Sequence, residues 1–472
     1  MKKFLHFGFL SLLCIIAAPA LVEAGEHKMQ LWTSTYAGGS HGLGVLYTVN
    51  EDGTQGGAVI NFDGANGANP NGTLVRGVDN KLYGTTQRGG QYDLGVLFSY
   101  NPSDSIFEVL HHFNGMDGSY PGDLVISSSG RVYGTTTTGG PNLSPDFPSG
   151  AGVLFSYEPS NKNFEKLVDF DGLSGAAPQG LMEAADGNLY GMCRQGGFQQ
   201  TGVIFCYQPL LAQYATIYNF FGTEGELPTK CKLIQASNGL LYGMTTWGGN
   251  TNQGVLFSYN VPTLSVNKLH DFNGVDGAYP SGTLLQASNG LLYGVTAYGG
   301  DNGTGEIFSY NIGTGVYTAI YSFDESLGSA PIGSLIEVSP GVLYGVTPEG
   351  GTYGLGVVFN YNISQHTYEV VSNCDGSLGG AQPINALVQY ATGINKLSET
   401  QFAVYPNPAS SNVNFNTGDF RPEFISISNA DGKSVLKAAF THSIDLSTLA
   451  PGVYIIELKN ETAFARKRIV KE

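Results

Sequence analysis

The side chains best suited to binding chemistry in this sequence stand beside Gly-Gly doublets that recur along the chain. They mix aromatic and charged groups, namely Arg88, Tyr92, Arg194, Trp247, Tyr298 and Glu349, with His41 next to an early doublet. Aromatic faces combined with polar groups suit stacking on sugar rings. Loop residues also vary freely without any function. A glycan-binding face and ordinary exposed loops are therefore the two interpretations of these positions.

Acidic residues recur in a second group of loops, which follow a phenylalanine and contain Asp, Asn and Gly. The acids are Asp63, Asp117, Asp171, Asp276 and Asp324. Asp and Asn oxygens could hold calcium, which takes about six to eight oxygen ligands. The same residue types build turns without any metal. Because no loop clusters three carboxylates, we expect no cofactor, with calcium as the one candidate.

Signatures of catalysis are sparse. Glu224 and Glu226 fall in loop sequence, and His111, His112 and His270 fall in predicted strands, where packed or solvated histidines are common. No Ser-His-Asp order, phosphate-cradling loop or zinc pattern occurs. An acidic pair assembled from distant repeats cannot be seen in a sequence, so an enzyme is neither shown nor excluded.

Four cysteines remain once an N-terminal leader that contains Cys14 is set aside: Cys193, Cys206, Cys231 and Cys374. Cys193 and Cys206 replace the Thr and Ser of other copies on neighbouring predicted strands. A Cys193–Cys206 bridge and free buried thiols are equally compatible with this spacing, because connectivity cannot be read from a sequence.

The doublets belong to a repeat of the form Leu-Tyr-Gly, Gly-Gly and then Gly-Val-x-Phe-x-Tyr. The aromatic residue after the leucine recurs at Trp32, Tyr83, Tyr133, Tyr190, Tyr242, Tyr293 and Tyr344, with separations of 51, 50, 57, 52, 51 and 51 residues. A period near 50 is typical of propeller blades. The one long interval comes from an insertion at residues 141–148, whose three prolines exclude a strand.

Each repeat predicts four short strands, which in the copy around Tyr83 cover residues 73–78, 81–86, 95–100 and 107–113. Such a unit cannot bury both faces alone, so radial stacking into a β-propeller is expected. The mature chain opens on a second strand near Leu31, and an orphan first strand at residues 385–390 follows the last full repeat. Pairing of these ends would complete a seventh blade and place Leu387 beside Leu31.

Strand alternation also predicts which loops share a face. The loops after the Gly-Gly doublets and those after the fourth strands should lie on one side of the disc. The tight hairpins should lie on the other side. We name the first side the Gly-Gly face.

Composition agrees with an all-β, exported protein. Gly accounts for 67 of 472 residues and Tyr plus Phe for 53, a composition typical of turns and aromatic strands. A net charge of -16 opposes a phosphate backbone, so nucleic acid is not an expected partner. Lys2, Lys3, an apolar run over residues 7–21 and a small-ended triplet closing at Ala24 predict a signal peptide at residues 1–24. The run is short for a membrane span, so no transmembrane helix is expected after cleavage.

The repeat pattern stops after Tyr390. Residues 25–390 are the expected seven-bladed propeller, 391–401 a linker, and 402–472 a small Ig-like β-sandwich with alternating strands. This last segment resembles the type A sorting domain of the type IX secretion system of Bacteroidetes. The matching positions are Tyr405-Pro406-Asn407-Pro408, Asp431-Gly432-Lys433, Gly452, Tyr454, Lys467 and Lys471. The resemblance implies an interaction with that secretion machinery and a place outside the cell or on its outer surface.

The repeats themselves resemble the bacterial tandem-repeat family called GloVer over about residues 31–390. That resemblance implies architecture and surface display and carries no chemistry. The leading hypothesis is a secreted or surface-displayed binding module with a glycan or cell-surface partner. The alternatives are a polysaccharide-active hydrolase or lyase with acidic groups at the propeller channel, and a structural coat or adhesin component.

Overall fold

The computed structural model describes residues 29–54, 56–377, 379–391, 395–396, 403–417, 422, 424–429, 434–459 and 463–472. Contacts separate a repeat unit, Met29–Tyr390, from the unit that contains Ala391–Glu472. The predicted signal peptide at 1–24 and most of the predicted linker at 391–401 lie outside the described residues. The described residues form strands and turns and no helix, so none of their elements is a membrane-spanning helix.

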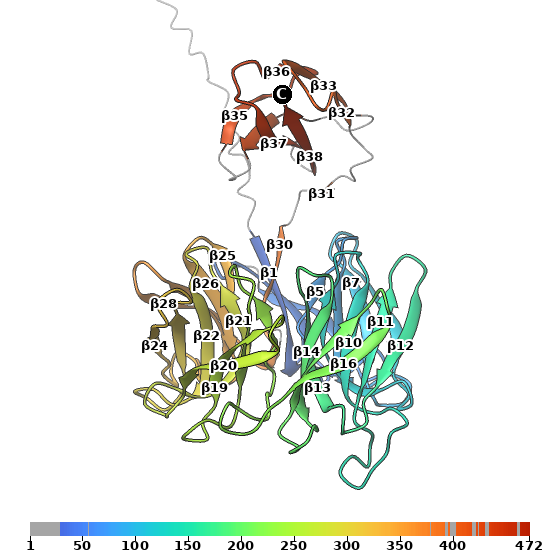
Figure 1. Ribbon diagram of the computed structural model, residues 1–472, viewed down its shortest axis with the longest axis vertical. Coiled ribbons are helices and arrows are strands. Elements are labelled where there is room, and N and C mark those ends of the chain that lie inside the picture. Colours follow the sequence, from blue (N-terminus) through green and yellow to red (C-terminus); the bar gives the residue numbers. More distant parts are fainter. Residues whose placement is uncertain are drawn as a thin grey trace, which may run out of the picture. The chain divides into compact units, whose positions relative to one another are not determined.

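The described part of the repeat unit forms seven antiparallel sheets, which Figure 1 shows standing side by side. Four sheets contain one complete repeat each, in uninterrupted order: β9 (Ser119–Ile126), β10 (Val132–Thr138), β11 (Val153–Glu158) and β12 (Asn163–Asp169); β13 (Ala176–Glu183), β14 (Leu189–Gln195), β15 (Val203–Gln208) and β16 (Gln213–Asn219); β17 (Ile234–Gln235), β18 (Leu241–Thr245), β19 (Val255–Asn260) and β20 (Ser265–Asp271); β21 (Ala278–Gln286), β22 (Leu292–Tyr298), β23 (Glu306–Tyr310) and β24 (Tyr317–Ser322).

Like the sheet that contains β17, two further sheets have short or broken first strands: β4 (Ala68–Pro70), β5 (Val75–Arg76), β6 (Leu82–Arg88), β7 (Val96–Asn101) and β8 (Ile106–His112); β25 (Ile336–Ser339), β26 (Val342–Thr347), β27 (Val357–Asn362) and β28 (Thr367–Asn373). The seventh combines both ends of the repeat region: β1 (Met29–Ala37), β2 (Val45–Asn50), β3 (Gly57–Asn61), β29 (Ala381–Pro383) and β30 (Val388–Ala391).

The ends of the repeat region meet as the sequence predicts. Strands β29 and β30 both pair with β1, and in Figure 1 the orange strand β30 lies beside the blue strand β1. Leu387 and Leu31, 2% and 0% exposed, belong to one hydrophobic cluster. Thr33 Oγ1 donates to Asn385 O at 3.2 Å, and Asn385 Nδ2 donates to Ser34 Oγ at 3.0 Å. The predicted contact between the first and last strands is therefore confirmed.

The glycine of each Leu-Tyr-Gly phrase makes room for a phenylalanine of the next strand. Gly84 lies opposite Phe98, and a Cβ on Gly84 would stand 2.4 Å from Phe98 Cζ. In the first copy both members of this pair are replaced: Thr33 stands in place of the glycine and lies opposite Tyr47, which stands in place of the phenylalanine. The Leu-Tyr-Gly and Gly-Val-x-Phe phrases are thus two halves of one packing unit.

Adjacent sheets are joined by a hydrogen bond from the residue that precedes the proline in the first-strand region of each repeat. This residue has a positive φ between 47° and 56°, and its N–H donates to a loop carbonyl of the preceding sheet. The seven bonds are Asn69 to Leu43, Tyr120 to Leu94, Ala177 to Ala151, Leu227 to Thr201, Tyr279 to Gln253, Ala330 to Thr304 and Gln382 to Leu355, at 2.8–3.0 Å. Their number equals that of the sheets, so the last sheet is bonded to its neighbours in the same way as the others.

The C-terminal unit contains two sheets around one core. The larger comprises β31 (Asn395–Lys396), β38 (Ala463–Lys471), β37 (Gly452–Lys459), β34 (Phe424–Asn429) and β35 (Ser434–Ala439), and the smaller β32 (Ala403–Tyr405), β33 (Asn412–Asn416) and β36 (Ser443–Asp445). Val413 and Phe415 of the smaller sheet share a buried cluster with Ile427 and Ile456 of the larger.

Candidate functional site

Each Gly-Gly doublet is tied to the loop that follows the fourth strand of the preceding sheet. The second glycine donates its N–H to a carbonyl of that loop in all seven copies: Gly39 to Gly376, Gly90 to Gly64, Gly140 to Gly115, Gly197 to Gly172, Gly249 to Gly222, Gly300 to Gly274 and Gly351 to Glu325, at 2.7–3.2 Å. The two groups of loops therefore lie on one face, as strand alternation predicts.

The doublet itself is a structural requirement. Gly89 and Gly90 both have a φ of 78°, which side-chain-bearing residues rarely adopt. A Cβ on Gly89 would lie 2.5 Å from Gly64 O. Because the backbone of the neighbouring loop occupies this space, the glycines position the loop and the adjacent variable residues carry any recognition.

Exposed apolar side chains are concentrated on the Gly-Gly face. Among the described residues of the repeat unit, eleven large hydrophobic side chains are exposed on the Gly-Gly face: Tyr92, Met116, Leu143, Leu173, Phe198, Phe221, Trp247, Val275, Tyr298, Leu327 and Tyr353. The opposite side exposes six, namely Val78, Ile106, Leu210, Leu211, Leu264 and Val316. Six of the eleven side chains on the Gly-Gly face are aromatic, whereas all six on the opposite side are aliphatic. The two faces therefore differ in chemistry.

Three aromatic rings form a cluster that spans two adjacent sheets; we call it the aromatic platform. Trp247 follows β18, and its ring centroid lies 4.6 Å from that of Tyr279 in the next sheet. Tyr279 lies in turn 6.0 Å from Tyr298 at the end of β22. Trp247 and Tyr298 remain 37% and 52% exposed. The platform therefore presents amphipathic ring faces to solvent.

The other predicted binding residues are placed separately. Arg88 is at the end of β6, 3.7 Å from the Asp93 carboxylate, and its guanidinium lies 5.4 Å from the Tyr120 ring centroid. Tyr92 and Arg194 are exposed. Glu349 is exposed and its backbone bridges to Ser329. The structure thus brings Trp247 and Tyr298 together through Tyr279. Arg88 and Tyr92 share the loop after β6, while Arg194 and Glu349 lie on two other loops.

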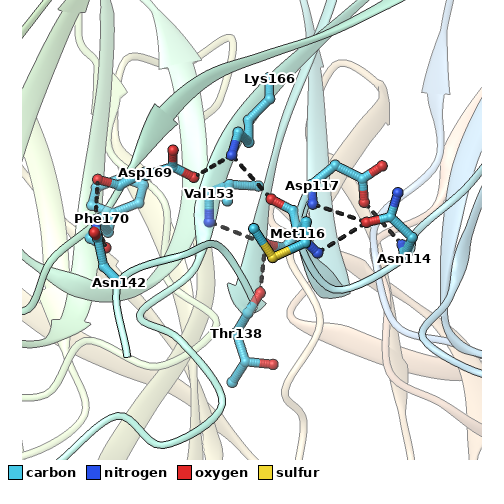
Figure 2. Close-up of polar contacts among 10 residues, drawn as sticks. Asn114, Met116, Asp117, Thr138, Asn142, Val153, Lys166, Asp169 and Phe170 are labelled. Atoms are coloured by element: carbon cyan, nitrogen blue, oxygen red, sulfur yellow. Dashed lines mark hydrogen bonds and ion pairs between the residues drawn. The ribbon is translucent and has the colours of Figure 1, made fainter. Parts of the chain in front are cut away.

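The acidic loops use their carboxylates to build their own turns. In the close-up of Figure 2, Asn114 N donates to Asp117 Oδ1 at 2.9 Å and Met116 N donates to Asn114 Oδ1 at 2.9 Å. Asp63, Asp171, Asp276 and Asp324 accept comparable bonds from Asn66, Ser174, Asn273 and Ser326. Within the described ranges no three His, Cys, Asp or Glu side chains gather in a way that could hold a metal. The contacts fit the turn interpretation, and calcium binding stays a prediction.

Figure 2 also shows how neighbouring loops and the insertion are held. Lys166 Nζ lies 2.8 Å from Asp169 Oδ1 and donates to Met116 O of the adjacent sheet at 3.0 Å. Asn142, in the insertion, donates its Nδ2 to the carbonyls of Asp169 and Phe170 at 3.2 and 3.0 Å. The inserted loop is therefore held on the Gly-Gly face by these hydrogen bonds.

Two of the histidines, His111 and His270, are packed against aromatic rings. His111 stacks on Phe164 with centroids 3.6 Å apart, and His270 stacks on Tyr317 at 3.8 Å, while their Nε2 atoms lie 2.9 and 3.1 Å from Asp117 and Asp276. Burial lowers the pKa of His270, so its neutral form is favoured.

All four described cysteines are free and buried, and Cys193 and Cys206 form no bridge. The two lie at different levels of the β14–β15 pair, since Cys193 faces Val203 and Cys206 faces Tyr190.

Most sorting residues that the structure describes lie at the end of the larger C-terminal sheet where β37 begins and β38 ends. Asn407 Oδ1 accepts from Val470 N at 2.9 Å, which joins the Tyr405-Pro406-Asn407-Pro408 turn to the last strand. Gly452 lies opposite Lys471 and Tyr454 opposite Ile469, and Lys467 faces Ile456 on the same strand pair. Asp431, Gly432 and Lys433 lie outside the described residues.

The sequence pattern of the Gloeobacter/Verrucomicrobia repeat matches residues 18–184 and 177–398, which together cover most of the chain. The chain belongs to this repeat family. A second pattern, the secretion system C-terminal sorting domain, matches residues 403–472. This tail indicates export to the cell surface or secretion through the type IX machinery. No curated protein sequence matches this member of the Gloeobacter/Verrucomicrobia repeat family.

Solved structures similar to this Gloeobacter/Verrucomicrobia repeat protein are propeller-like. A putative 6-phosphogluconolactonase from Bacteroides fragilis is 14% identical, with 77% of this chain and 98% of that chain covered and a TM-score of 0.53. The periplasmic gluconolactonase PpgL of Pseudomonas aeruginosa is 15% identical, with 77% and 99% covered and a TM-score of 0.54. At these identities the likeness shows the fold alone.

Sequence reasoning missed part of the exposed aromatic set. Tyr353 is 61% exposed two residues after its Gly-Gly doublet, as Tyr92 is, and Phe198 is 78% exposed directly after its doublet. Comparing the two positions after Gly-Gly across all seven copies would have found both. Tyr279 was missed because it precedes a proline inside a strand, a position whose role becomes visible only in the folded repeat.

Proposed function

We propose that this protein is a binding module, exported by the type IX machinery to the cell surface or beyond, that holds a glycan on its Gly-Gly face. In this proposal the seven sheets are the blades of one closed β-propeller, and the C-terminal unit is an Ig-like sandwich that the secretion machinery engages. The equivalent bonds between all adjacent sheets and the pairing of β29 and β30 with β1 support the ring. The sorting pattern at 403–472 supports the route of export.

One observation carries the glycan proposal: the exposed aromatic rings of the repeat unit lie on the Gly-Gly face. A pyranose presents an apolar face of C–H groups, which packs on an aromatic ring, and hydroxyls at its edge, which need polar partners. Trp247 and Tyr298 supply ring faces about Tyr279, and the Tyr298 hydroxyl is a polar group beside them. Trp247 and Tyr298 are open to solvent, so the ligand proposed for the platform is a segment of a polysaccharide lying across the rings.

The first expected result concerns the double variant Trp247→Ala/Tyr298→Ala. Removing two central rings from an interface costs about 1 kcal/mol or more each, so binding of the retained polysaccharide should weaken at least about tenfold. The measurement is affinity electrophoresis against a panel of polysaccharides, followed by calorimetry on those that retard the wild type.

The matched control is Leu211→Ala/Leu264→Ala, which removes side chains that are 62% and 57% exposed on the opposite side. Equal weakening by both double variants would contradict the proposed face. A wild-type protein that is retarded by no polysaccharide would overturn the glycan proposal and favour a structural role, which self-association without saturable ligand uptake would support.

The hydrolase or lyase alternative needs two acidic groups at the channel. Among the described residues, the cavity between the inner strands is lined by a single carboxylate, that of Asp123, which is paired with Lys232 at 3.2 Å. A paired single carboxylate does not supply the general acid and base that glycoside hydrolysis uses. The binding module is therefore the better-supported function.

A further inference from the structure

A small cavity lies where the inner first strands of the sheets converge. It has a volume of about 20 Å³ and is lined by Asn71, Thr73, Asp123, Lys230, Gly282, Ile332, Gly333, Ser334, Ile384, Asn385 and Ala386. These residues occupy equivalent stretches of the repeat, between the proline of the first strand and the next core leucine. The cavity is therefore a product of the whole ring rather than of one sheet.

The repeat varies in this stretch at one copy in particular. Between Pro228 and Leu233 stand four residues, including Lys230 and Lys232, whereas the other copies have two or three residues there and no lysine. Lys230 adopts a φ of 55° and is held by a bond from its N–H to Gln179 Oε1 at 3.1 Å. The extra residue thus places two ammonium groups at the centre of an otherwise acidic protein, with a net charge of -16.

The carboxylate at the cavity already has its partners. Asp123 Oδ1 accepts from Thr73 N at 2.5 Å, and Oδ2 lies 3.2 Å from Lys232 Nζ. The stem of Lys232 runs across Gly180, where a Cβ would stand 2.4 Å from Lys232 Cγ. Because Gly180 makes room for this stem, Lys232 reaches across the intervening sheet and neutralises Asp123.

Lys230 is left without such a partner among the described residues. Burial lowers the pKa of Lys230 to about 8, and Asp123 opposes that shift only in part. Because Lys232 neutralises Asp123, the half-buried ammonium of Lys230 leaves one positive charge in excess at the cavity. A partly buried charge without a counterion is costly, so an anion that enters this cavity would be stabilised.

We propose that this cavity is a binding site for one small inorganic anion of the size of chloride, held by Lys230. The supporting donors are the amide of Asn71 and the hydroxyls of Thr73 and Ser334. Ser334 Oγ accepts from Thr283 N at 2.7 Å, which leaves its hydroxyl hydrogen free to donate into the cavity. Asn385 Nδ2 is directed to Ser34 Oγ at 3.0 Å, so this side chain fixes the wall instead.

The size of the cavity decides the class of anion. A volume of roughly 10–15 Å³ on this scale admits one water molecule, so about 20 Å³ admits a single species of that size. A halide fits this volume, whereas phosphate, sulfate or a sugar acid would extend beyond it. The anion would contact residues of several sheets, among them residues 384–386 between β29 and β30, where the two ends of the repeat region meet. It is therefore expected to stabilise the ring.

The experiment uses bromide as the probe on the full mature chain. Crystals grown or soaked in sodium bromide should show an anomalous peak within hydrogen-bond distance of Lys230 Nζ. The Tm should also rise with sodium chloride more than with sodium methanesulfonate of equal ionic strength. This difference should be present at about pH 6.5 and lost at about pH 9.5, because only the protonated lysine attracts the anion. The charged group facing Lys230 is the Asp123 carboxylate, which is itself paired with Lys232.

The variant that tests the site is Lys230→Met, with Lys162→Met, a surface lysine paired with Glu108, as its control. The chloride-specific rise in Tm should disappear in the first and persist in the second. Absence of bromide from the cavity in wild-type crystals would overturn the proposal, whether or not Lys230→Met folds. Equal responses to chloride and methanesulfonate in the wild type would overturn it as well.

Discussion

A mature chain that ends at Gly380 instead of Tyr390 is expected to lose its folded monomeric state. The missing segment contains β29 and β30, which both pair with β1, and Leu387, which is 2% exposed. Without it, β1 becomes an open strand edge, and such edges favour aggregation. Loss of the buried Leu387, Ile384 and Ala386 together with the closing bonds should lower the free energy of unfolding by about 5 kcal/mol or more.

The matched control is the chain that ends at Tyr390, which retains the closing strands and lacks only the C-terminal unit. Contacts separate that unit from the repeat unit, so the control should remain a monomer with an unchanged denaturation midpoint. Size-exclusion chromatography with light scattering and urea denaturation measure both properties. A monomeric chain ending at Gly380 with a wild-type midpoint would show that the ring does not depend on its closing strands.

The second large effect is expected from Gly356→Ala, at the contact between the last full repeat and the closing strand. Gly356 has a φ of 98°, and a Cβ there would lie 2.2 Å from Thr347 O and 2.8 Å from Pro383 Cδ. Val357, the residue after Gly356, pairs with Thr347 in the sheet, so the Gly356 backbone cannot move away from Thr347 O. The clash therefore adds to the cost of the positive φ. We expect a loss of about 3 kcal/mol in the free energy of unfolding, measured in guanidinium chloride.

Gly354→Ala provides the comparison, because Gly354 also has a positive φ of 70° but has nothing within 4 Å of its Cβ position. That variant should lose only the conformational term of about 1 kcal/mol. If both variants lose the same amount, close packing against Pro383 does not explain the recurring glycine before Val-x-Phe.

The architecture was largely predictable because the same Gly–Phe packing unit recurs in six of the seven copies. The period, the order of strands and the pairing of the two ends all follow from the positions of the Leu-Tyr-Gly phrase. The first strand was the least accurate element: the prediction was 73–78, whereas the structure has β4 at Ala68–Pro70 and β5 at Val75–Arg76. The error has a physical cause, since Asn69 before Pro70 takes a positive φ and uses its N–H to bond the neighbouring sheet.

The candidate site was only partly predictable. The sequence identified Trp247 and Tyr298 but could not show that Tyr279 lies between them, because their contacts join different sheets. The same limit applied to the channel. Lys232 reaches Asp123 over more than a hundred residues of sequence, and residues of several sheets line the cavity. In both places the informative residues are those that break the repeat.

We propose that recognition resides in the variable residues of the Gly-Gly face and that the repeated motif only positions them. Hydrogen–deuterium exchange of the full mature chain, with and without the polysaccharide that it retains best, tests this claim most directly. We predict slower exchange at residues 247–250 and 298–303, which surround the aromatic platform. Protection confined to the opposite turns at residues 209–212 and 261–265 would contradict the claim.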